Sequence, residues 1–127
     1  MFKDNQAFSS FSVDDVEAAR RFYGEKLGLE VAPNAMGNLD LVLAGGARIM
    51  VYPKPTHQAA TFTVLNFMVP DIEAAVDGLE AAGVAMIHYG VPEMNQDAKG
   101  IAREASGGPQ IAWFNDPAGN TLAVIKG

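Results

Sequence analysis

Residues 13–19 read VDDVEAA, and residues 69–75 read VPDIEAA. A second pair of matching segments follows at nearly the same spacing, LGL at residues 27–29 and AGV at residues 82–84. Internal similarity at a fixed period marks a repeated structural unit, and it decides how the other segments are interpreted. The sequence therefore predicts a chain built from two copies of one module.

Each copy begins with a strand followed by a helix. Residues 8–13 and 64–69 carry the period-two pattern that is typical of strands. Asp15 and Asp71 come next, where a carboxylate can accept backbone N–H groups and oppose the positive end of a helix dipole. Apolar residues then recur at helical spacing, until Gly28 and Gly83 supply the left-handed conformation that ends a helix.

Three strand-like segments follow each helix. In the first module they are residues 29–31, 39–43 and 48–52, with Gly45-Gly46 as the hairpin turn between the last two. In the second module they are residues 84–88, 111–114 and 121–125, and the turn-forming DPAGN of residues 116–120 joins the last two. The order β-α-β-β-β, repeated twice, predicts an α+β fold.

Length and composition limit the possible classes of protein. A chain of 127 residues suits a single domain, which we divide into module 1 (about residues 5–53), a linker (54–60) and module 2 (about 61–126). The net charge of −6, with scattered basic residues, argues against a nucleic-acid partner. The absence of cysteine excludes disulfides and thiolate sites. No stretch is apolar enough to span a membrane, so we expect a cytoplasmic protein.

Three segments together resemble the vicinal oxygen chelate superfamily, which includes glyoxalase I, extradiol dioxygenases, methylmalonyl-CoA epimerase and bleomycin-resistance proteins. They are VDDVEAARRFY at residues 13–23, LGL at 27–29 and WFNDPAGNTL at 113–122. The resemblance implies that the two modules form a curled, cup-like mixed sheet. In metal-using relatives, inward His, Gln or Glu side chains of this cup hold one divalent ion, which polarises the substrate.

The resemblance also implies where those metal ligands would lie. The positions correspond to Phe8, to Val64, to Ala123 and, within one residue, to Met50, with Ile49 as the neighbouring alternative. None of these side chains offers an oxygen or nitrogen donor, so we expect neither a metal nor another cofactor. A displaced site would need His57 or His88 with the carboxylates of Glu93, Asp97 or Glu104, and a lone histidine is more often a hydrogen-bonding residue.

Strand alternation predicts what the cup contains. If Leu65, Phe67 and Val69 pack under the helix, their alternate neighbours face the cup, and the same reasoning places Phe11 and Val13 under the first helix. Arg103 lies in the long loop that would cover the cup, and Trp113 follows that loop closely in the sequence. The predicted ligand-binding residues are Phe8, Ser10, Ser12, Arg48, Met50, Tyr52, Val64, Asn66, Met68, Arg103, Trp113 and Ala123.

This mixture of apolar area and a few polar groups is typical of a small-molecule pocket, although the same side chains could simply fill the cup as core. We expect a glyoxalase- or bleomycin-resistance-like protein whose metal-free cup binds a small, partly apolar or cationic molecule. Two alternatives stay open. One is a metal-independent acid–base enzyme that uses Tyr52, His88, Arg103 or Glu93. The other is a metal-dependent lyase, isomerase or dioxygenase with unusual ligands.

Two further expectations concern the surroundings of the cup. Residues 90–109 form a long loop rich in Gly, Pro and charge, which predicts a lid that becomes ordered when a ligand binds. Open strand edges and apolar faces predict a homodimer, as relatives also often form.

Overall fold

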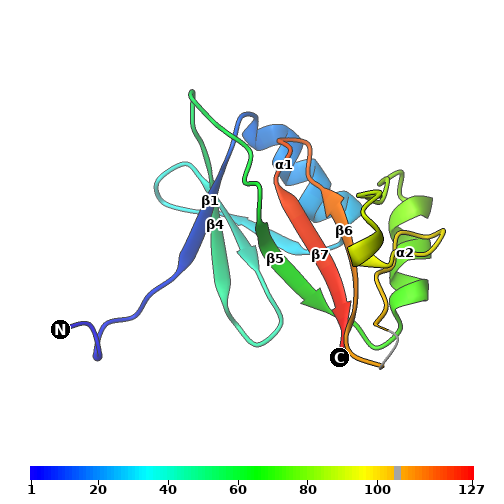
Figure 1. The fold of residues 1–127 in the computed structure, drawn as a ribbon. Helices are drawn as coiled ribbons and strands as arrows, with labels where there is room; N and C mark the ends of the chain where they lie inside the picture. Colours follow the sequence, from blue (N-terminus) through cyan, green and yellow to red (C-terminus); the bar gives the residue numbers. More distant parts are fainter. Residues whose placement is uncertain (105–106) are drawn as a thin grey trace. The chain divides into compact units, whose positions relative to one another are not determined.

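The computed structural model describes residues 1–104 and 107–127. It divides into two compact units, Met1–Gln58 and Ala59–Gly127, and each contains one mixed sheet with a helix (Figure 1). The α+β fold class predicted from the repeated order of elements is therefore confirmed. None of the described helices is long and apolar enough to cross a bilayer.

Unit 1 contains a four-stranded sheet of order β1-β4-β3-β2. Its elements are β1 (Ser9–Val13), α1 (Val16–Arg21), the π-helical turn η1 (Phe22–Lys26), β2 (Glu30–Pro33), β3 (Leu39–Val42) and β4 (Arg48–Pro53). β1 pairs with β4 in parallel, and the other two pairs are antiparallel. Gly45 and Gly46, both with positive φ, form the predicted turn between β3 and β4.

The first helix begins where the sequence predicts but ends differently. The Asp15 carboxylate accepts the Ala18 N–H at 3.1 Å, which confirms the cap. The expected α-helix gives way after Arg21 to η1, in which the Leu27 N–H donates to the Phe22 carbonyl. Phe22 and Tyr23, at the start of this turn, are both buried. The structure therefore differs from the sequence prediction in the helix type after Arg21, and not in the residues that are buried.

Unit 2 contains a three-stranded sheet of order β5-β7-β6, with β7 in the middle (Figure 1). Its elements are β5 (Thr63–Met68), α2 (Ile72–Ala81), the 3₁₀ turn η2 (Pro92–Met94), β6 (Gln110–Asn115) and β7 (Thr121–Lys126). The Asp71 carboxylate caps α2 by accepting the Ala74 N–H at 3.1 Å, as predicted. Gly83 follows with a φ of 85° and ends this helix.

The strand predicted at residues 84–88 is not formed. Only an isolated bridge between Met86 and Phe114 joins this segment to β6. The Gln96 side chain instead makes hydrogen bonds to backbone groups of this part of the chain. Its Nε2 donates to the carbonyls of Ile87 at 2.9 Å and of Gly100 at 2.8 Å, and its Oε1 accepts the Tyr89 N–H at 2.8 Å.

We expect the Gln96→Ala variant to lose about 1–3 kcal/mol of unfolding free energy, because it removes three hydrogen bonds to the backbone. Urea denaturation followed by circular dichroism measures the change. Gln58→Ala is the matched control, since Gln58 is an exposed glutamine in unit 1. Equal midpoints for the two variants would contradict a structural role for Gln96.

Candidate functional site

The face of the unit 1 sheet opposite its core carries half of the residues predicted for the cup. Strand register aligns Ser10 with Met50 and Asp40, and aligns Ser12 with Tyr52. The alternate residues form the buried face, among them Phe11, Val13, Leu41 and Val51. Alternation along β1, β3 and β4 therefore places six of the predicted residues on one side of one sheet: Phe8, Ser10, Ser12, Arg48, Met50 and Tyr52.

Three of these residues line a pocket of about 360 Å³. Its lining consists of Phe8, Asn34, Ala35, Met36, Asp40, Arg48 and Met50. Phe8 and Met36 are large apolar side chains with 69% and 70% of their surface exposed. Exposed apolar surface gathered at a concavity is typical of a binding site. We call this concavity the unit 1 pocket.

The charged part of the unit 1 pocket is an ion pair. Arg48 Nη1 lies 3.3 Å from Asp40 Oδ2, and Asn34 Nδ2 donates to Asp40 Oδ1 at 3.2 Å. The Asp40 side chain is largely buried, with 19% exposed, whereas 55% of the Arg48 side chain is exposed. Arg48 therefore presents the accessible charge of the pocket.

The turn between β2 and β3 completes the pocket, and the sequence did not reveal it. The Asn34 Oδ1 accepts the N–H groups of Met36 and Asn38, at 2.9 and 3.1 Å. Such local acceptance by asparagine fixes a tight turn. Asp40 was also missed, although its alternation with Leu39 and Leu41 on a predicted strand would have placed it opposite the core.

A second hollow, of about 860 Å³, adjoins the unit 1 pocket. It lies beside the β3–β4 turn and shares Phe8 and Arg48 with the pocket. Ser12 has another neighbour on this face, because its Oγ lies 2.7 Å from His57 Nδ1. That contact joins β1 to the segment after β4, so His57 is a hydrogen-bonding residue in unit 1.

In unit 2, strand register aligns Asn66, Ala123 and Trp113 across the sheet. Ala123 is fully buried, while Asn66 and Met68 are exposed. Tyr89 packs against Trp113 with ring centroids 5.4 Å apart and an interplanar angle of 82°. Burial raises the pKa of the Tyr89 phenol above its ordinary value. Val64 lies at a register shift in β5, which interrupts the alternation that aligned it with Asn66.

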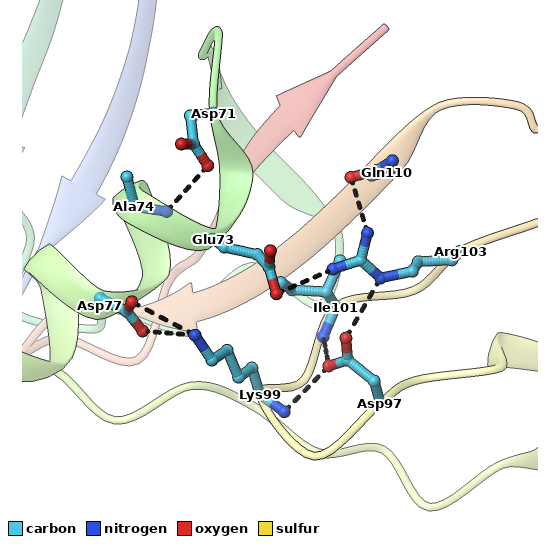
Figure 2. A network of polar contacts seen from close by, with 9 residues as sticks. All are labelled: Asp71, Glu73, Ala74, Asp77, Asp97, Lys99, Ile101, Arg103 and Gln110. Carbon is cyan, nitrogen blue, oxygen red and sulfur yellow. Dashed lines mark hydrogen bonds and ion pairs between the residues drawn. The ribbon is translucent and has the colours of Figure 1, made fainter.

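Arg103 takes part in a different set of contacts, shown in Figure 2. Its guanidinium lies 3.5 Å from Glu73 of α2 and 3.2 Å from Asp97, and it donates to Gln110 at 3.1 Å. The structure therefore places Arg103 with α2, and not with Asn66, Trp113 and Ala123 on the opposite face of the sheet. It also lines a separate hollow of about 560 Å³.

The described part of the predicted lid is held against unit 2 by Arg103 and by two further residues, Lys99 and Ile101. Lys99 Nζ donates to Asp77 of α2 at 2.9 Å, and Ile101 is fully buried. Residues 105 and 106 of this segment lie outside the described residues. Ordering on ligand binding stays a prediction, which hydrogen exchange with and without ligand would test.

A model of the glyoxalase/bleomycin resistance protein/dioxygenase superfamily matches residues 7–124. The chain belongs to this superfamily. The match spans both sheets and all of the helices, in agreement with the vicinal oxygen chelate resemblance of the sequence. No curated protein matches this superfamily member.

Solved structures share the fold of this superfamily member. The fosfomycin resistance protein FosX from Listeria monocytogenes is 14% identical with a TM-score of 0.73, covering 98% of this chain and 93% of FosX. A superfamily member from Sphaerobacter thermophilus is 20% identical with a TM-score of 0.70, covering 96% and 98%. A glyoxalase family protein from Enterococcus faecalis is 22% identical with a TM-score of 0.69, covering 98% and 99%. At these identities the similarity concerns the fold.

The metal of the superfamily does not fit the residues of this member. The implied ligand positions hold Phe8, Met50, Val64 and Ala123, which have no oxygen or nitrogen donor in their side chains. Within residues 1–104 and 107–127, no group of three or more histidines and carboxylates is arranged to hold an ion. We therefore derive no chemical step through a metal.

Stability below neutral pH should depend on Asp97 in the loop of unit 2. Burial by itself would raise the pKa of Asp97, but hydrogen bonds from the Ile101 N–H, the Arg103 side chain and the Lys99 N–H lower it below its ordinary value. A carboxylate with a lowered folded pKa stabilises the fold above its unfolded pKa of about 4, and that stabilisation disappears as the pH falls through the folded pKa.

We expect Asp97→Asn to cost about 1 kcal/mol at pH 7, because the amide keeps an acceptor for the Lys99 and Ile101 N–H groups but loses the charge and the acceptor for Arg103 Nε–H. The difference between wild type and variant should shrink as the pH falls from 7 to 3. Urea denaturation at both pH values measures it, and a difference independent of pH would contradict the assignment. Asp4→Asn, in the exposed N-terminal segment, is the control.

Proposed function

We propose that this superfamily member binds a small, partly apolar molecule in the unit 1 pocket without using a metal. The observation that carries the proposal is the grouping of exposed apolar side chains, Phe8 and Met36, around the Asp40–Arg48 ion pair. Apolar surface supplies affinity for such a ligand, and a few fixed polar groups orient it. The volume of about 360 Å³ lies within the range of small-molecule sites, about 300–1,000 Å³.

Binding can be tested with the neutral apolar dye Nile red, whose emission increases in apolar surroundings. Phe8 and Phe62 form a matched pair, because each is 69% exposed and only Phe8 belongs to the unit 1 pocket. We expect Phe8→Ser to weaken dye binding about tenfold, since burial of one aromatic ring supplies at least about 1.4 kcal/mol. Phe62→Ser should bind like wild type. Equal affinities of Phe8→Ser and wild type would disprove the site.

A natural ligand can be sought by native mass spectrometry of the purified protein. Recovery of the same molecule, chemically unchanged after incubation and release, favours binding without catalysis. Conversion to a product of different mass would instead favour the enzyme alternatives predicted from the sequence. Elemental analysis accompanies this measurement, because one equivalent of a divalent metal per chain would contradict a metal-free site.

A homodimer, a single domain and a cytoplasmic location stay predictions. The homodimer prediction rests on exposed strand edges and apolar side chains; Met68, for example, is exposed at the end of β5, an outer strand of its sheet. Sedimentation equilibrium at micromolar concentration tests it, and a monomer mass would disprove it.

A further inference from the structure

We propose that the ligand of the unit 1 pocket is an apolar carboxylate and that Arg48 binds its carboxylate group. This inference rests on the proposed function, because it assumes that the pocket holds a small, partly apolar molecule. It goes further by assigning the charge of that molecule, which the sequence predicted to be partly apolar or cationic.

The two charged groups of the pocket differ in what they can still bind. Both oxygens of Asp40 have partners, since Oδ1 accepts from Asn34 Nδ2 and Oδ2 accepts from Arg48 Nη1. The charge of Asp40 is already paired with Arg48, and only 19% of its side chain is exposed, so a cationic ligand has little access to the remaining lone pairs. Asp40 therefore serves as an anchor for Arg48 and not as a receptor for a cation.

Arg48, in contrast to Asp40, is exposed and has donors that remain available to a ligand. Its contact with Asp40 uses Nη1 alone, and among residues 1–104 and 107–127 no hydrogen bond from Nε or Nη2 is present. Nε–H and one Nη2–H point in parallel, and their spacing matches the two oxygens of a carboxylate. The ion pair with Asp40 restrains the guanidinium, which lowers the entropy cost of binding.

The rest of the pocket fits the apolar part of such a ligand. Phe8, Met36 and Met50 line the same concavity as Arg48. Asn38 Nδ2 lies 3.6 Å from Met50 Sδ, which restrains the thioether. A carboxylate held by Arg48 would leave an attached hydrocarbon or ring in contact with these side chains, where burial adds affinity.

Three isosteric probes separate the contributions: 4-phenylbutyrate, 4-phenylbutylamine and 4-phenylbutan-1-ol. Titration of ¹⁵N-labelled protein at low salt and pH 7, followed by NMR, gives affinities into the millimolar range and reports folding in the same spectra. We expect wild type to bind the butyrate about tenfold more tightly than the alcohol, and the amine most weakly. Shifts should concentrate at residues 34–36 and 48–50.

Variants of the ion pair test the assignment of the charge. Arg48→Gln should weaken binding of the butyrate much more than binding of the alcohol, so that the preference for the butyrate disappears. Arg48→Lys should retain part of the preference, because it keeps the charge and loses the paired donors. Arg21→Gln is the matched control, since Arg21 and Arg48 have equally exposed side chains (55%) and Arg21 lies on α1. It should behave like wild type.

The outcomes distinguish the inference from the proposed function. Alcohol and butyrate bound equally well in the pocket would overturn the inference and support the proposed function. The same holds for tighter binding of the amine, which would assign the receptor role to Asp40. Binding of none of the three probes would overturn both. A butyrate preference that survives Arg48→Gln would overturn the assignment to Arg48.

Discussion

Replacing Tyr23 by alanine is expected to lower the free energy of unfolding by about 3–5 kcal/mol. Tyr23 is fully buried, and its ring centroid lies 5.9 Å from that of Phe11 and 5.1 Å from that of Phe22. Removal of the ring deletes buried apolar area and leaves a cavity that the surrounding sheet and helix cannot fully close. Urea denaturation followed by far-ultraviolet circular dichroism measures the loss.

Two variants serve as controls for Tyr23→Ala. Tyr23→Phe keeps the ring, so its loss should be much smaller than that of the alanine variant. Phe62→Ala removes an aromatic side chain that is exposed, and it should change stability by less than about 0.5 kcal/mol. A loss below about 1 kcal/mol for Tyr23→Ala would mean that the core of unit 1 does not depend on this ring.

Asp116→Ala is expected to lower the free energy of unfolding by about 2–4 kcal/mol. Asp116 is buried in the turn between β6 and β7. Its Oδ1 accepts the N–H groups of Ala118 at 3.0 Å and Asn120 at 2.8 Å, and its Oδ2 accepts the Asn120 side-chain amide at 3.2 Å. The alanine variant leaves these buried donors without their acceptor, which costs more than the bonds themselves contribute.

The network continues beyond the turn and provides a sharper test. Asn120 Oδ1 accepts the Ala60 N–H at 3.1 Å, so Asp116 orients the amide that holds the start of unit 2. A double-mutant cycle of Asp116→Ala and Asn120→Ala should therefore show strong coupling. Asp14→Ala, which removes an exposed carboxylate, is the control. Additive losses for Asp116 and Asn120 would contradict the network.

The sequence predicted the features of the fold that depend on local chemistry. Asp15 and Asp71 cap helices because a carboxylate at the start of a helix can accept the free N–H groups of the first turn, and both caps are present. Alternation along the first and fourth strands also predicted a common face for Phe8, Arg48 and Met50, and these three side chains line the unit 1 pocket. Short-range patterns of this kind can be predicted because the backbone geometry of helices and strands fixes the directions of successive side chains.

Features that depend on contacts between distant residues were not predicted. Helical spacing also contains no signal for the π-helical turn that begins at Phe22. The Gln96 side chain holds the segment that was predicted as a strand through hydrogen bonds to Ile87 and Tyr89. Nothing in the sequence distinguishes this glutamine from other glutamines in polar loops. The ion pairs of Arg103 with Glu73 and Asp97 could not be predicted from the sequence either, because they depend on how the loop packs against α2.

The missing strand at residues 84–88 also affects where the length of this chain can vary. β6 and β7 are paired along their full lengths, whereas a single bridge at Met86 joins the preceding segment to the sheet. Insertions or deletions between Tyr89 and Gln96 can therefore alter the loop without shifting the register of the strands. In unit 1 a change of length within a strand would move every side chain beyond it to the other face. Evolutionary and engineered variation in length should accordingly accumulate in loops such as residues 89–96, while the strands of either unit vary by substitution.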